Sequence, residues 1–340
     1  MFTWLNKSQP TQLGSITQHA EGLAFASIAY DDAQKPVLKK CIFQAQLSDS
    51  KTTLNQLLQQ FENTKQPIIT LLDASQFLLL LMQRPGVEEQ ELPDAVRWQI
   101  KDQLKYPAEE AIIEILEIPG QQQRGRMPMI YVVVAHRDNV KSSIKFIEDA
   151  DLNLQYVDIP ELAQRNISSL LAEDTIGVAL LNIQATQSLL TITHEGELYL
   201  SRVIDIGYEH LEEQEAKKQD DTELSLEESL SESENNISKI VLEIQRSLDY
   251  YESHYGKAAI SNLVLAPLEN DIPNLNEQLT RNLGVVVKNL DLNNLVNSKI
   301  NIEPEVQARC FSAIGAALRL PDNTTSNNKF DEGVNNIKRV

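Results

Sequence analysis

The fold of this chain is decided by residues 176–202, which read IGVALLNIQATQSLLTITHEGELYLSR. Three short runs rich in apolar and β-branched residues predict strands over Ile176–Ile183, Leu189–His194 and Glu197–Ile206. Glu195-Gly196, between the last two runs, is typical of a hairpin turn. The stretch therefore predicts three consecutive strands in a meander.

The same order of elements occurs in both halves of the chain. After residues 176–202, apolar residues at helical spacing predict a long helix over Ile237–Tyr255, and a strand follows at Ile260–Ala266. In the first half, strands predicted at Gly22–Tyr30 and Pro36–Gln46 precede alternating helices and strands. Such alternation favours parallel strands covered by helices, so we predict an α/β fold with two similar lobes around a cleft.

Composition suggests where these lobes begin and end. We predict a first lobe over residues 1–172, with a small subdomain at about 88–150, and a second lobe over residues 173–320. Residues 321–340 are polar and rich in Asn, which predicts a disordered tail. Residues 209–236 hold eleven acidic residues and two lysines, too polar to offset the entropy of ordering, so we expect a mobile insertion there. The alternative is an acidic docking segment for a basic partner.

Charge and cysteine content exclude several classes of protein. The net charge is −19, from 30 Lys and Arg against 49 Asp and Glu, whereas phosphate contacts need clustered cations. This argues against nucleic acid or anionic lipid as a direct partner. The two cysteines, Cys41 and Cys310, are too few for a disulfide scaffold or a thiolate zinc site, which favours a reducing compartment.

The apolar segments of the chain do not predict insertion into a membrane. The most apolar of them, Phe77–Met82, is far shorter than the ~20 residues of a spanning helix. No secretory signal is visible at the start of the sequence. We therefore expect a cytoplasmic protein that reaches a membrane only through a partner.

Motifs of enzymes are missing from the sequence. It contains no G-x-x-x-x-G-K-[ST], G-x-G-x-x-G or G-x-S-x-G pattern, and its five histidines are scattered without an H-x-x-x-H pair. A metal or catalytic site needs convergent partners, which this pattern does not supply. We therefore predict no catalytic residues and no metal ligands.

Several stretches resemble one family. The duplicated plan resembles the actin-like (ribonuclease H-like) fold, and within it the PilM-type proteins of type IV pilus assembly. The stretches that carry the resemblance lie within residues 13–320: LPDAVRWQIKDQLKYPAEEAIIE from Leu92, residues 176–202, IQRSLDYY from Ile244 and FSAIGAALR from Phe311. Within the family, the chain is most similar to the branch that serves mannose-sensitive haemagglutinin (MSHA) pili.

The elements that hold ATP in such proteins are altered here. The first phosphate element, usually Asp-x-Gly, is matched to Leu13–Thr17, which offers Gly14 and Ser15 but no carboxylate. The second is usually Asp-Ile-Gly and here runs from Asn182 to Ser188; its candidate cleft residues are Asn182, Gln184, Thr186 and Ser188. A side chain at Gln184 obstructs the close approach that glycine permits.

The adenosine segment is altered as well. The resemblance implies a Gly-Gly pair at this place, but the sequence has Ala266 followed by Pro267. We therefore expect a degenerate nucleotide cleft and no cofactor. The alternatives are weak binding of ATP with Mg²⁺ or a weak actin-like ATPase.

The resemblance also implies a partner. PilM-type proteins bind the short cytoplasmic N-terminal segment of a PilN-like single-span inner-membrane protein, together with other platform or motor components. The segment would lie against the small subdomain, where Arg97, Trp98 and Tyr106 are candidate contacts. The alternative for Trp98 is packing in the subdomain core. A further alternative is the related cytoplasmic domain of a type II secretion platform protein, which normally continues into a membrane-spanning helix.

Overall fold

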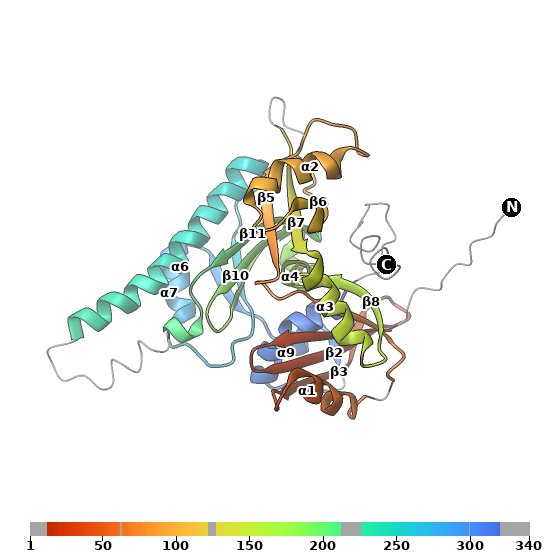
Figure 1. The fold of residues 1–340 in the computed structure, drawn as a ribbon. Coiled ribbons are helices and arrows are strands. Elements are labelled where there is room, and N and C mark those ends of the chain that lie inside the picture. Colours follow the sequence, from red (N-terminus) through yellow and green to blue (C-terminus); the bar gives the residue numbers. More distant parts are fainter. Residues whose placement is uncertain (1–11, 62, 122–126, 212–225, 299, 320–340) are drawn as a thin grey trace.

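The computed structural model describes residues 12–319 except 62, 122–126, 212–225 and 299. Two mixed sheets and one smaller antiparallel sheet form its framework (Figure 1). The strands of the first sheet, in spatial order, are β14 (Asn297–Ser298), β3 (Pro36–Ala45), β2 (Gly22–Tyr30), β1 (Gln12–His19), β4 (Pro67–Leu71) and β8 (Asn153–Asp158). Those of the second are β11 (Glu197–Ile204), β10 (Ser188–His194), β9 (Val178–Ile183), β12 (Asn262–Leu265) and β13 (Val286–Asn289).

The two large sheets share one topology. In each, three consecutive strands form an antiparallel meander, and two further strands continue the sheet in parallel from the first strand. The strands of each sheet, leaving out β14, can be numbered one to five in chain order. Their spatial order across the sheet is then three, two, one, four, five in both sheets. This duplicated meander with two parallel strands is the actin-like fold, which confirms the fold class expected from the sequence.

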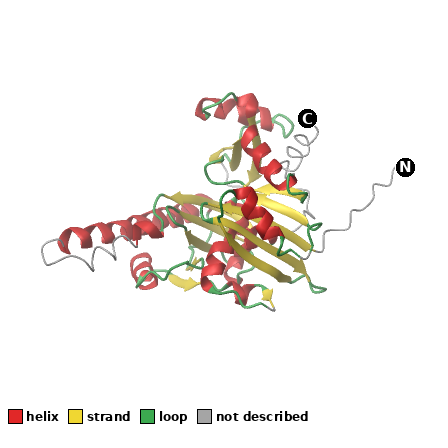
Figure 2. Cartoon of the chain, turned by 60° about the horizontal axis from the view of Figure 1, so that its bottom comes forward, coloured by secondary structure: helices red, strands yellow, loops and turns green. Residues whose placement is uncertain are grey.

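Helices cover both large sheets and connect them. Their bounds are α1 (Ser50–Leu58), α2 (Leu92–Ile100), α3 (Arg137–Glu148), α4 (Pro160–Ser168), α6 (Leu226–Tyr255), α7 (Leu275–Leu283), α8 (Leu292–Leu295) and α9 (Pro304–Ala317). Short 3₁₀ turns lie at Lys101–Gln103, Ala108–Glu110 and Ala172–Thr175. Helix α6 extends well beyond the sheets in both views (Figures 1 and 2).

Helices α4 and α9 cross between the lobes. Helix α4 packs on β9–β11 of the second sheet although it follows the first, and α9 packs on β1–β3 of the first sheet although it follows the second. The two helices also pack on each other. At the crossing, a Cβ on Gly315 would lie 2.3 Å from the carbonyl oxygen of Ala163, so only glycine allows this approach. The Asn166 amide donates to the Gly315 carbonyl at 3.0 Å and fixes the contact.

The crossing corrects the predicted boundary between the lobes. Residues 173–320 were expected to form the second lobe, but β14 pairs with β3 and α9 covers the first sheet. A strand of two residues carries no periodic signal, and the partner of an apolar helix face cannot be read from that face alone. The expected tail, residues 321–340, lies outside the described residues.

The small subdomain begins and ends earlier than residues 88–150. Its sheet consists of β5 (Phe77–Gln83), β7 (Met129–His136) and β6 (Ala111–Glu117), all antiparallel, with β7 in the centre. Its core lies between this sheet and α2 and contains Leu92, Val96, Ile100 and Val132. Helix α3, which was included in the expected subdomain, packs mainly on β8 of the first sheet and also contacts β7.

The stretch that begins at Leu92 does not stay helical as far as Pro107. Helix α2 ends at Ile100, and Leu104 is extended at the end of the following 3₁₀ turn. The approach to Pro107 disfavours helix there. The expected mobile insertion at residues 209–236 overlaps α6, which begins at Leu226, while residues 212–225 lie outside the described residues.

Candidate functional site

The first expected phosphate element lies inside a strand. Gly14 and Ser15 are buried in β1, and a Cβ on Gly14 would lie 2.8 Å from the Cδ1 atom of Ile68. The Ser15 hydroxyl donates to the carbonyl of Ala313 in α9 at 2.5 Å. Both residues therefore serve packing within the first lobe, which corrects their assignment to a phosphate loop. The turn after β1 lies between His19 and Gly22.

The second phosphate element, which runs from Asn182 to Ser188, lies at the end of a strand, as the sequence indicated. Asn182 is buried in β9, and the Gln184 N–H donates to the Gln187 carbonyl at 2.9 Å, which closes a tight turn before β10. Thr186 is exposed at this turn. The Ser188 hydroxyl donates to the carbonyl of Ile206 at 2.6 Å. The hydroxyl of Ser188 is thus already engaged within the fold.

The segment after β11 covers this turn. The Gln184 carbonyl accepts from the Tyr208 N–H at 2.8 Å, and the Ala185 carbonyl accepts from the Glu209 N–H at 3.1 Å. A Cβ on Gly207 would lie 2.2 Å from the Ala185 carbonyl oxygen. The chain itself therefore occupies the space next to the turn.

Ala266 lies at the end of β12, where a pocket opens. Its N–H donates to the Leu181 carbonyl at 2.9 Å. The pocket has a volume of about 800 Å³, and no Lys or Arg is among the described residues that line it. Its lining includes four carboxylates: Glu269, Asp271, Glu277 and Asp291. The field of these carboxylates opposes a phosphate in this pocket.

Arg309 of α9 links the two lobes at this place. Its guanidinium lies 3.7 Å from a carboxylate oxygen of Glu21, in the turn between β1 and β2. It lies 3.1 Å from an oxygen of Glu269, which follows β12 in the second lobe, and 3.1 Å from one of Glu305. Sequence reasoning missed this residue, because nothing in a lone arginine indicates which distant carboxylates it meets.

No metal centre was found among the residues that the structure describes: no group of three or more His, Cys, Asp or Glu side chains there is arranged to hold an ion.

The three residues predicted to contact a partner lie in different surroundings. The Arg97 guanidinium donates to the carbonyls of Ala108 and Ala111 at 2.5 and 2.9 Å, so it holds α2 against the start of β6. The Tyr106 ring packs edge-on against His136, with ring centres 4.6 Å apart. Both side chains therefore make their contacts within the subdomain.

Trp98, in contrast, lies on the surface. Its exposed fraction is 69%, and the Lys101 ammonium lies 4.8 Å from the ring centre. The alternative in which Trp98 packs in the subdomain core is therefore wrong. An exposed tryptophan beside a cation offers a large apolar contact with a charged rim.

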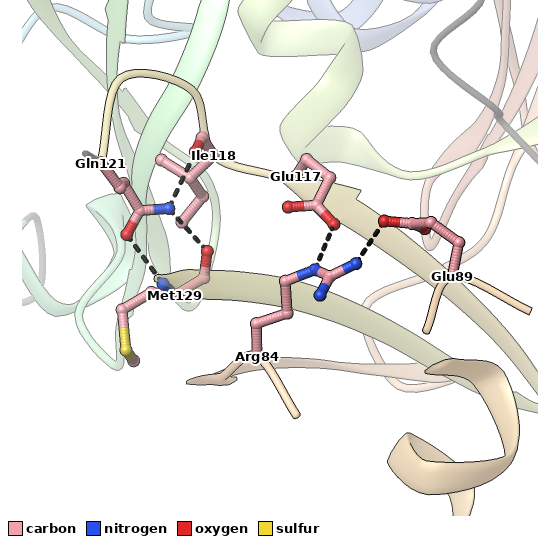
Figure 3. Close-up of polar contacts among 6 residues, drawn as sticks. All are labelled: Arg84, Glu89, Glu117, Ile118, Gln121 and Met129. Atoms are coloured by element: carbon pink, nitrogen blue, oxygen red, sulfur yellow. Dashed lines mark hydrogen bonds and ion pairs between the residues drawn. The ribbon is translucent and has the colours of Figure 1, made fainter. Parts of the chain in front are cut away.

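Side-chain contacts stabilise the end of the small sheet at which β5 and β6 end and β7 begins (Figure 3). Arg84, just after β5, pairs with Glu117 of β6 at 3.1 Å and with Glu89. The Gln121 side chain accepts from the Met129 N–H and donates to the Met129 carbonyl, both at 2.7 Å. The Arg84–Glu117 ion pair ties the two edge strands to each other, and the Gln121 contacts tie the connection before β7 to the start of that strand.

Strand β5 is an edge of this small sheet. Its inner side pairs with β7, and its outer side has no strand neighbour among the described residues. The strand reads FLLLLMQ, and Leu78 is 43% exposed. An apolar edge strand is a template for pairing with an extended segment of another chain.

The family model of the type IV pilus assembly protein PilM matches residues 31–320. The chain belongs to the PilM family. Among solved structures, it resembles a chain of a PilM–PilN type IV pilus biogenesis complex, with a TM-score of 0.71 and 18% identity over 90% of this chain and 98% of that one.

Weaker matches include two further structures. The ethanolamine utilization protein EutJ of Carboxydothermus hydrogenoformans has a TM-score of 0.48 and 10% identity, over 92% of this chain and 91% of EutJ. The cytoplasmic domain of EpsL, from the type II secretion system of Vibrio cholerae, has a TM-score of 0.44 and 10% identity, over 88% and 94%. Within the described part of the PilM-family chain, no helix has the length and apolar character needed to cross a membrane.

Proposed function

We propose that this PilM-family protein is a scaffold of a type IV pilus assembly platform. In this role it binds the short cytoplasmic N-terminal segment of a PilN-like single-span inner-membrane protein. Membership of the family carries the proposal, and the similar solved chain belongs to a PilM–PilN complex. The bound partner holds the protein at the cytoplasmic side of the inner membrane.

The small subdomain offers the features that such a segment needs. An extended peptide gains main-chain hydrogen bonds when it adds to an edge strand, and β5 presents such an edge. Aromatic anchors contribute most to the energy of peptide binding, and Trp98 is exposed on helix α2, which packs on the same sheet and contacts β6. We place the contact on this subdomain for both reasons.

The nucleotide cleft is degenerate in this proposal, and the protein is not an ATPase. The Ser15 and Ser188 hydroxyls donate hydrogen bonds to backbone carbonyls of the fold. Residues 207–209 cover the turn between β9 and β10. Arg309 joins Glu21 to Glu269 between the two lobes, and the pocket beyond Ala266 is acidic. These features oppose the binding of a triphosphate.

The pilus served is of the MSHA type, according to the stretches quoted from the sequence. Neighbouring reading frames test this assignment. We expect a single-span protein with a short cytoplasmic start beside a gene for an MSHA-type pilin. A neighbourhood of type II secretion genes would favour the alternative platform.

Calorimetry with a synthetic peptide that copies the cytoplasmic start of the PilN-like partner tests the binding site. We expect a dissociation constant in the micromolar range, about −8 kcal/mol, because a short segment must offset its own ordering. Trp98→Ala should weaken binding about tenfold. The matched control is Val286→Ala on β13, where the side chain is 55% exposed; it should bind as the wild type does. Equal affinity of all three proteins would place the site elsewhere.

A further inference from the structure

The two cysteines of the chain lie against each other. Cys41 is in β3 of the first sheet and Cys310 is in α9, at opposite ends of the sequence. Their thiols are in hydrogen-bonding contact. Cys310 belongs to a buried apolar cluster, and Cys41 packs against the same cluster from its edge.

Contacts on both sides of the pair fix the register of α9 over the sheet. Phe43 shares a strand face with Cys41, because alternate residues of a strand point the same way. The guanidinium of Arg309, next to Cys310, lies 4.8 Å from the Phe43 ring centre. On the other side, Ser15 bonds to the Ala313 carbonyl. The meeting of the two thiols is thus a consequence of how α9 docks.

The two thiols differ in their access to solvent. Cys41 is half-buried, whereas Cys310 is fully buried. The hydrogen bond with Cys41 and burial raise the pKa of the Cys310 thiol. A reagent from solution therefore meets Cys41 first. Burial and the raised pKa slow any direct reaction of Cys310, which can react only with a sulfur that Cys41 brings to it.

We propose that Cys41 and Cys310 form a reversible disulfide that fastens α9 to β3 when the chain meets a low-molecular-weight disulfide. The Cys41 thiolate attacks one sulfur of that disulfide, which gives a mixed disulfide and releases one thiolate. The Cys310 thiolate then attacks the Cys41 sulfur and releases the second thiolate. The two cysteine thiols lose two electrons and two protons, and the small disulfide becomes two thiols.

The bond acts on the helix that joins the lobes. Helix α9 packs on the first sheet, crosses α4 and carries Arg309, which reaches Glu21 and Glu269. Oxidation would hold this helix in one position on β3. The disulfide would also close a covalent loop from Cys41 to Cys310. Such a loop lowers the conformational entropy of the unfolded chain and so stabilises the folded state.

Treatment of the reduced full-length protein with oxidised glutathione tests the proposal. We expect loss of both thiols, an intact mass lower by two hydrogen atoms and a linked pair of peptides containing Cys41 and Cys310. The melting temperature should rise and return after addition of a dithiol reductant. Cys310→Ser should instead retain glutathione on Cys41, and Cys41→Ser should stay unmodified while folded.

The wild-type protein alone decides the outcome, so the test does not depend on how well either variant folds. A lasting glutathione adduct on Cys41 with Cys310 still reduced would overturn the proposal. A dimer linked through Cys41, or two unreacted thiols after prolonged treatment, would overturn it as well.

Discussion

Arg319, two residues beyond the end of α9, donates to the carboxylate of Asp158 at the end of β8 over 2.9 Å, and both side chains are buried. The guanidinium also lies 4.5 Å from the ring centre of Tyr156 in the same strand. Asp158 directly precedes α4, since only Ile159 separates it from Pro160. The pair therefore anchors the end of α9 at the place where the chain leaves the first sheet.

Loss of this pair should cost much of the stability of the fold. Arg319→Leu leaves the Asp158 charge buried without its counter-ion, so we expect a loss of about 3–5 kcal/mol in the free energy of unfolding. Denaturant titration followed by circular dichroism measures it. Arg246→Leu is the matched control, because Arg246 pairs with Glu243 on the exposed side of α6 and should cost less than about 1 kcal/mol. A similar small loss for both variants would contradict the role of the buried pair.

The crossing of α4 and α9 gives a second test. Gly315→Ala places a methyl group against the Ala163 backbone, which cannot move without separating the helices, so we expect a loss of about 3 kcal/mol. Gly86→Ala is the control, since its nearest neighbour would be the flexible end of Met127 at 3.9 Å. Unfolding of both variants in denaturant makes the comparison. An unchanged midpoint for Gly315→Ala would show that the crossing is looser than described.

The raised pKa of Glu161 predicts that the stability of the fold depends on pH. Burial at the start of α4, with a smaller effect from the Asp158 charge, raises the pKa of Glu161 from 4.5 to about 7. Between these values the folded protein keeps a proton that the unfolded chain releases. This contribution to the free energy of unfolding therefore falls as pH rises and is lost above pH 7.

The variant Glu161→Gln removes this titration. It should gain stability relative to the wild type as pH rises from 4.5, by roughly 3 kcal/mol at pH 8, and differ little from it below pH 4.5. Thermal unfolding across this range measures the difference. Parallel curves for the two proteins would contradict the raised pKa.

The meander of the second lobe could be predicted from sequence because its signals are local, whereas β1 of the first lobe was assigned to a phosphate element. The strands expected at Leu189–His194 and Glu197–Ile206 differ from β10 and β11 by one or two residues at their ends. The exposure of Trp98 could also have been predicted from the sequence. Val96 and Ile100 mark the buried face of α2, and Trp98 lies half a turn from both.

Long-range relationships could not be predicted in this way. The contact of Arg309 with Glu21 and Glu269 depends on the docking of α9, and charge alone does not select a partner. Gly14 was assigned to the first phosphate element because Leu13–Thr17 was matched to the Asp-x-Gly of similar proteins. In the structure its lack of a side chain accommodates Ile68 of the neighbouring strand instead.

The altered cleft predicts that the protein does not hydrolyse ATP. We expect no Mg²⁺-dependent release of phosphate above the background of a Thr186→Arg preparation, a variant that adds bulk to the exposed turn before β10. A coupled phosphate assay on both preparations makes the comparison. Turnover present in the wild type and absent from the variant would show a working site.

Co-purification with the full-length PilN-like partner tests the scaffold most directly. The partner is expressed in membranes, extracted in detergent and passed over the immobilised protein, both intact and without its cytoplasmic N-terminal segment. We predict that the intact partner is retained and that the shortened one is not. Retention of both forms, or of neither, would contradict binding through that segment.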